Sequence, residues 1–83
     1  SLKPCAVCGR PSTVFGCFIP DESKQMQYGA PAGTTRVLFY GLCDLCASGF
    51  PAIIPEIEQR ALAEVSGNLE LTMIVIVDTR EQQ

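Results

Sequence analysis

The sequence contains no histidine and no tryptophan, and its six basic residues are scattered. Histidine is the usual general base near neutral pH, so its absence removes the commonest route to acid–base catalysis. Nine acidic residues outnumber the basic ones and give a net charge of −3, which disfavours generic binding of nucleic acid. The longest apolar run, MIVIV at residues 73–77, is far too short to span a bilayer, which predicts no membrane partner.

Catalytic motifs are also missing. The acidic side chains are spread along the chain, and neither a nucleophile beside a base nor a glycine-rich phosphate loop occurs. We therefore expect a protein that is not an enzyme. The N-terminal residues show no basic-then-apolar signal pattern, so we expect a cytoplasmic location.

The length of 83 residues predicts a single domain over residues 1–83, with a flexible polar tail at about 79–83. A domain of this size buries only about 60 to 65% of the surface that its unfolded chain exposes. A metal, disulfides or a partner chain often supplies the missing stability. Five cysteines in so short a chain therefore indicate a stabilising device.

Two strands are predicted in the first half of the chain, at residues 13–19 and 34–43, because both segments are rich in β-branched and aromatic residues. The two strands are neighbours in sequence, so an antiparallel hairpin is their simplest pairing, with residues 21–33 as a long polar loop at its tip. Loops of this length often carry function. Within the loop, Met26 and Tyr28 are candidate interaction residues.

The segment after Pro51 has the period of an amphipathic helix, which begins at or just before Pro55 and stops near Gly67 and Asn68. Its apolar positions are Ile54, Ile57, Ala61, Leu62 and Val65. Its opposite, solvent-facing side carries Glu56, Gln59, Arg60 and Glu64. An i,i+4 spacing lets Arg60 pair with the glutamates on either side of it.

A C-terminal strand is predicted over residues 71–77, and it is apolar on both faces. Val75 and Val77 lie on one face, and Ile74 and Ile76 lie on the other. One short helix covers only one face of a sheet, so the other face requires the loop, the terminal segments or a second chain. Ile74 and Ile76 are the candidates for a partner-facing outer surface.

Four of the five cysteines form two CxxC pairs, Cys5 with Cys8 and Cys43 with Cys46. A two-residue gap lets both thiolates of a pair converge on one ion, and two pairs supply the four sulfurs of a structural zinc site. A zinc ion that already holds four thiolates has no open position for water or substrate. The spacing therefore predicts one structural Zn²⁺ ion bound by these four residues.

Other uses of the cysteines stay open at this stage. Disulfides would require an oxidising compartment, a redox dithiol would leave one CxxC pair unexplained, and iron takes the same four-sulfur geometry. Cys17 lies in the apolar segment VFGCFI, which predicts a small buried core residue. The alternative for Cys17 is a reactive thiol or a fifth ligand.

The order of these features resembles the treble-clef zinc fingers over residues 3–66. Cys5, Cys8 and Gly9 match the CPxCG-like zinc knuckle of that class, the two strands match its β-hairpin, and Cys43 and Cys46 take the place of the ligands at its helix start. The resemblance implies a small zinc-stabilised α+β domain. Prolines interrupt the segment after Cys46, so a zinc-ribbon-like variant stays open.

Three functions are compatible with the sequence. The first is a protein-interaction or regulatory module, with a homodimer as one form, which the closed metal site and the two-sided apolar strands favour. The second is a nucleic-acid-binding zinc finger, with basic side chains near the knuckle, despite the acidic balance. The candidates for that role are Lys3, Arg10, Lys24 and Arg36. The third is a thiol redox protein.

Overall fold

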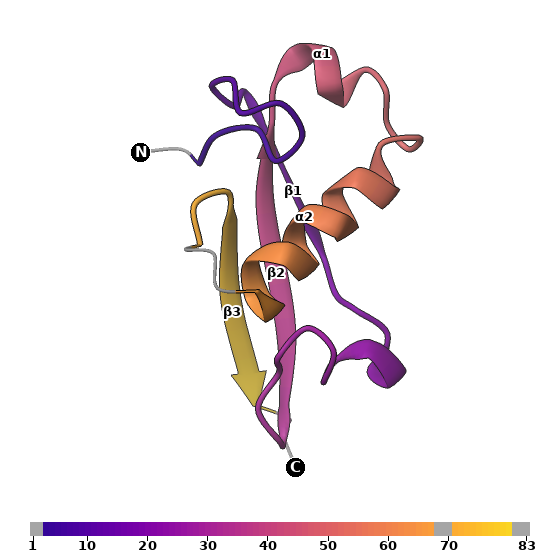
Figure 1. Ribbon diagram of the computed structural model, residues 1–83, viewed down its shortest axis with the longest axis vertical. Helices are drawn as coiled ribbons and strands as arrows, with labels where there is room; N and C mark the ends of the chain where they lie inside the picture. Colours follow the sequence, from indigo (N-terminus) through magenta and orange to yellow (C-terminus); the bar gives the residue numbers. More distant parts are fainter. Residues whose placement is uncertain (1–2, 68–70, 81–83) are drawn as a thin grey trace.

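A three-stranded antiparallel sheet and one long helix form the fold. The structure, a computed structural model, describes residues 3–67 and 71–80. In chain order the elements are β1 (Val14–Phe18), β2 (Thr34–Leu42), α1 (Asp44–Ala47), α2 (Ile54–Ser66) and β3 (Ile74–Arg80). β2 is the central strand, and α2 lies across one face of the sheet (Figure 1). The predicted α+β class and antiparallel sheet are confirmed.

The predicted elements lie close to the observed ones, with the largest shift at the C-terminus. β3 continues through Thr79 and Arg80, where the sequence predicted the start of a flexible tail, because both residues pair with the beginning of β2. Asn68, one of the predicted helix-stop residues, and residues 81–83 lie outside the described ranges. Among the residues that the structure describes, no helix has the length and apolar content needed to cross a membrane.

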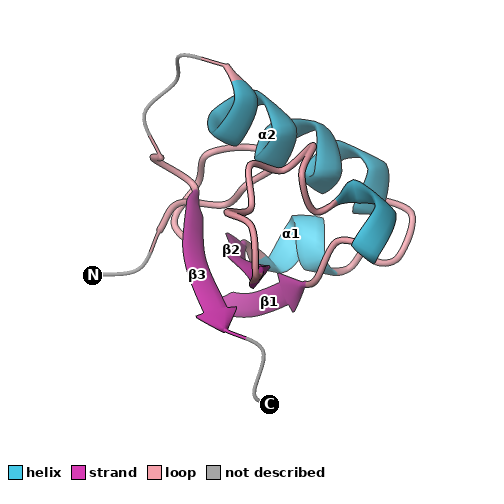
Figure 2. Cartoon of the chain, turned by 90° about the horizontal axis from the view of Figure 1, so that it is seen from below, coloured by secondary structure: helices cyan, strands magenta, loops and turns pink. Residues whose placement is uncertain are grey.

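The inner face of the sheet packs against α2. In the register of β2 and β3, Leu38 lies opposite Ile76 and Tyr40 lies opposite Ile74. Leu38, Tyr40 and Ile74 are buried in one cluster with Ile57 of α2. Figure 2 shows α2 on one side of the sheet, with the opposite side free of helices.

The partner-facing surface predicted at Ile74 and Ile76 is corrected by this register. Ile74 is only 1% exposed, and Ile76 is half-buried against the core. Side chains alternate along a strand, so Ile74 and Ile76 face the helix and Val75 and Val77 lie on the outer side. Val75 and Val77, together with Phe39 of β2, are exposed apolar residues of the outer face.

The loop over residues 21–33 folds back against the sheet. It contains the short 3₁₀ helix η1 (Glu22–Lys24), and Tyr28 is 2% exposed, with its ring edge-on to Phe18 at a centroid distance of 5.5 Å. Tyr28 is therefore a core residue, and the expectation that it faces a partner is wrong. Met26 lies on the surface, 86% exposed.

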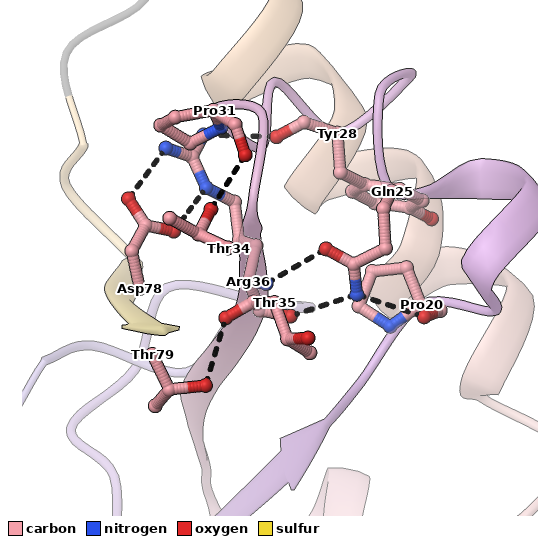
Figure 3. Close-up of polar contacts among 9 residues, drawn as sticks. All are labelled: Pro20, Gln25, Tyr28, Pro31, Thr34, Thr35, Arg36, Asp78 and Thr79. Atoms are coloured by element: carbon pink, nitrogen blue, oxygen red, sulfur yellow. Dashed lines mark hydrogen bonds and ion pairs between the residues drawn. The ribbon is translucent and has the colours of Figure 1, made fainter. Parts of the chain in front are cut away.

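Polar contacts from β2 hold this loop in place (Figure 3). The guanidinium of Arg36 donates to both carboxylate oxygens of Asp78, at 2.8 and 2.9 Å, and to the carbonyl of Tyr28 at 2.9 Å. The side chain of Gln25 accepts the backbone N–H of Arg36 at 2.7 Å and donates to the carbonyl of Pro20 at 2.9 Å. The hydrogen bonds from Arg36 lower the pKa of Asp78.

Glu64 differs from its predicted place on the solvent-facing side of the helix. It is 3% exposed, and Thr72 and Met73, just before β3, lie against its carboxylate. Its carboxylate accepts the backbone N–H of Met73 at 3.2 Å and pairs with Arg60 at 2.6 Å, so the predicted Arg60–Glu64 pair is confirmed. Through these contacts, the buried carboxylate links α2 to the segment just before β3.

We expect Glu64→Ala to lower the free energy of unfolding by about 3 kcal/mol, because it leaves the Met73 N–H and the Arg60 guanidinium without their acceptor. Denaturant unfolding of the metal-loaded protein measures this change. The matched control is Glu56→Ala on the exposed surface of the same helix, where we expect a loss below about 1 kcal/mol. Equal losses in the two variants would contradict the structural role of Glu64.

Candidate metal centre

The first pair of cysteines lies in a tight turn before β1. The N–H of Gly9 donates to the carbonyl of Cys5 at 2.9 Å, and the N–H of Cys5 donates to the carbonyl of Arg10 at 2.7 Å. Gly9 has a φ of +81°, in the left-handed region that glycine adopts without strain. The closed turn brings the Cys5 and Cys8 side chains to the same side, as the CxxC spacing predicted.

This turn is docked onto the end of β2 through Gly41. The N–H of Ala6 donates to the Gly41 carbonyl at 2.9 Å, and Cys5 forms a single parallel bridge with Gly41. A Cβ at position 41 would collide with the Ser12 hydroxyl, which donates to the Lys3 carbonyl at 2.6 Å. Sequence reasoning missed Gly41, although a glycine inside a strand pattern is a signal of close backbone approach.

The second pair of cysteines begins where β2 ends. Cys43 is the N-cap residue of α1, and its sulfur accepts the backbone N–H of Cys46 at 3.5 Å. The carbonyl of Cys43 accepts the N–H of Ala47 at 2.9 Å and starts the single turn of α1. α1 ends at Ala47 and α2 begins only at Ile54, so the second pair stands on a short helix of its own.

The four sulfurs of the two pairs converge on one point between the turn and α1. All four Sγ atoms lie within 4.8 Å of one another, and those of Cys8 and Cys43 are 3.5 Å apart. A tetrahedral ion with metal–sulfur bonds of about 2.3 Å has sulfur–sulfur edges of about 3.8 Å. A disulfide would require about 2.05 Å, and all five cysteines are free. The four predicted ligands are thus positioned to bind one metal ion.

The surroundings of the four thiols are unequal. Burial raises the pKa of Cys5, but the backbone N–H groups of Cys43, Cys8 and Val7 outweigh burial and lower that pKa to about 6. The N–H of Cys46 is the leading cause of a lowered pKa at Cys43. Burial, followed by the neighbouring thiols, raises the pKa of Cys46 to about 12. Backbone donors therefore favour the thiolate form of Cys5 and Cys43, whereas Cys46 would lose its proton on binding a cation.

Cys17 and Arg36 lie apart from this cluster. Cys17 is exposed on β1, so the prediction of a buried core residue is wrong; β1 is an edge strand and leaves this side chain uncovered. Arg36 pairs with Asp78 near the opposite end of β2, so it is not one of the basic residues close to the knuckle.

Comparisons with family models, with curated proteins and with solved structures find no match to this chain.

Thiol counting tests whether the cluster holds a metal. In the protein as purified under reducing conditions and then desalted, we expect one fast-reacting thiol, Cys17, and all five after chelation in denaturant. Because Cys8 is exposed, slow reaction of this residue reflects metal binding rather than burial. Cys17→Ser should leave no fast thiol in the metal-loaded form. Fast reaction of two or more thiols before chelation would contradict a four-cysteine metal site.

Proposed function

We propose that the protein is a zinc-stabilised protein-interaction module with no enzymatic activity. The observation that carries this proposal is the convergence of four cysteine sulfurs within 4.8 Å. Four thiolates match the donor set and geometry of structural zinc, and they leave no coordination position for a substrate. In this proposal the ion joins the N-terminal turn to the end of the hairpin, and surfaces elsewhere on the domain bind partners.

The arrangement supports zinc over a thiol redox role. A redox dithiol needs one reactive pair, whereas here both pairs face the same point and Cys8 lies closer than a van der Waals contact to Cys43 of the other pair, at 3.5 Å. Four thiols that remain available to a metal require a reducing environment, which supports the cytoplasmic location. Among divalent ions, zinc is the usual occupant of a tetrahedral four-sulfur site.

The interaction role is supported by apolar surface that the described fold leaves uncovered. Phe15 is 62% exposed on β1, and Phe39, Val75 and Val77 are each about 40% exposed on the outer face of the sheet. Contiguous exposed apolar surface of this kind often marks binding sites in small soluble proteins. β1 and β3 are both edge strands in the described sheet, so each has a free backbone edge.

We expect removal of the metal to unfold the domain. Structural zinc sites in small finger peptides contribute about 10–16 kcal/mol, which is at least as large as the whole stability of a typical domain of about 5–15 kcal/mol. Chelation should therefore abolish the far-UV circular dichroism of the native fold, and added Zn²⁺ should restore it. Cys43→Ser should fold poorly and bind less than one ion per chain, as measured by elemental analysis.

Cys17→Ser is the matched control for this experiment, because it also removes a thiol but lies outside the metal cluster. We expect this variant to keep one ion per chain and the native spectrum. An unchanged spectrum after complete chelation of the wild-type protein would remove the basis of the proposed function.

A further inference from the structure

A groove follows the free side of β1, where this strand forms the margin of the sheet (Figure 2). Two adjoining cavities of about 420 and 300 Å³ make up the groove, and both are lined by Cys17, Tyr40 and Phe50. Ala47 of α1 lines the larger cavity, and Ile54 of α2 lines the smaller one. The groove therefore has an edge strand as one wall and the two helices with their connection as the other.

The Tyr40 hydroxyl is the polar group at the base of this groove. Tyr40 is only 6% exposed, and its ring lies over Gly16, where an added Cβ would come within 2.5 Å of the hydroxyl oxygen. Within the described part of the chain, this hydroxyl makes no hydrogen bond, yet it is not sealed from solvent. A hydroxyl open to solvent bonds to water in the free protein, and a ligand in the groove can take the place of that water.

Glu58 places a negative charge at the end of the groove nearest α2. Its side chain is half-buried and lines the smaller cavity. The ion pairs within the described ranges join Arg36 to Asp78 and Arg60 to Glu64, so Glu58 has no basic partner there. The apolar walls and the carboxylate together fit a ligand that carries an apolar side chain close to a cation.

The free edge of β1 adds a third feature of the same groove. β1 pairs with β2 on one side, and no described strand pairs with its other side. In an antiparallel strand, alternate residues direct their N–H and C=O groups to the unpaired edge, where an extended peptide can add as a further strand. A second copy joined symmetrically through β1 would offer only VFGCF, which contains no basic residue for Glu58.

We propose that this groove binds an extended peptide segment of a partner protein. The segment adds as a strand to β1, packs an apolar side chain against Phe50, donates a hydrogen bond to or accepts one from Tyr40, and places a lysine or arginine at Glu58. This proposal rests on the interaction role proposed above and assigns it a surface and a class of partner.

The probe is a library of random twelve-residue peptides, selected on the zinc-loaded full chain. We expect the enriched peptides to combine apolar residues of strand type with at least one lysine or arginine. In the complex, backbone NMR shifts should change along β1 and around Phe50, and bound peptide should slow the alkylation of Cys17. NMR shift changes confined to Val75, Val77 and Phe39 would contradict peptide binding in the groove, although they would still agree with an interaction role.

Paired variants separate the loss of contacts in the groove from general effects of charge and folding on peptide binding. Glu58→Lys should weaken the selected basic peptides roughly tenfold or more, whereas Glu56→Lys, the same charge change on the same helix, should alter binding less than about threefold. Tyr40→Phe keeps the ring and should weaken binding roughly fivefold. Each variant is first checked for one bound ion and a native spectrum.

Other outcomes also decide the proposal. Equal affinities in Glu58→Lys and Glu56→Lys would overturn it, and so would a library that yields no binder to protein with one ion per chain and a native spectrum. Concentration-dependent dimerisation that protects Cys17 from alkylation would show that a second copy of the chain occupies the groove. This result would overturn the proposal of a peptide ligand. None of these results changes the metal dependence of the fold, which chelation and elemental analysis measure separately.

Discussion

The close spacing of four cysteine sulfurs is the constraint on which the rest of this small domain depends. With the sulfurs within 4.8 Å of one another, backbone N–H groups favour the thiolate form of Cys5 and Cys43, while the raised pKa of Cys46 opposes complete ionisation. A divalent cation removes this conflict because it binds all four sulfurs in the ionised form. A bound metal ion would then offset the cost of bringing two distant turns together, which a core of this size supports only in part.

The remaining contacts extend outward from this point along β2. At the metal end, Gly41 lets the first turn dock closely and Cys43 starts α1. In the middle, Leu38 and Tyr40 meet α2, whose position is secured by the buried carboxylate of Glu64. At the far end, Arg36 and Gln25 hold the long loop over the sheet. One strand therefore connects the four-cysteine cluster to the core and the loop, and in the described part of the chain the outer edge of β1 is unpaired.

Local sequence patterns predicted the four-cysteine site better than they predicted which side chains are exposed. The CxxC spacing identified the four ligands because turn geometry alone places both thiols of a pair on one ion. On β2, Leu38 is buried and Phe39 is 38% exposed, as alternation along a strand requires. The alternation of side chains did not show which face of β3 the helix covers, because the strand register and the position of α2 are tertiary properties. The prediction therefore placed Ile74 and Ile76 on the outer face, which is wrong. Tyr28 lies in a polar loop and Glu64 was assigned to the solvent-facing side of the helix, and both are buried by residues outside their own segments.

X-ray absorption at the zinc K-edge of the purified protein measures the central claim most directly, because it reports the ligands around the ion without reference to the fold. With one zinc ion per chain, we expect a first shell of four sulfur atoms at about 2.3 Å and no nitrogen or oxygen ligand. A first shell with nitrogen or oxygen atoms, or with fewer than four sulfurs, would contradict a closed site formed by Cys5, Cys8, Cys43 and Cys46.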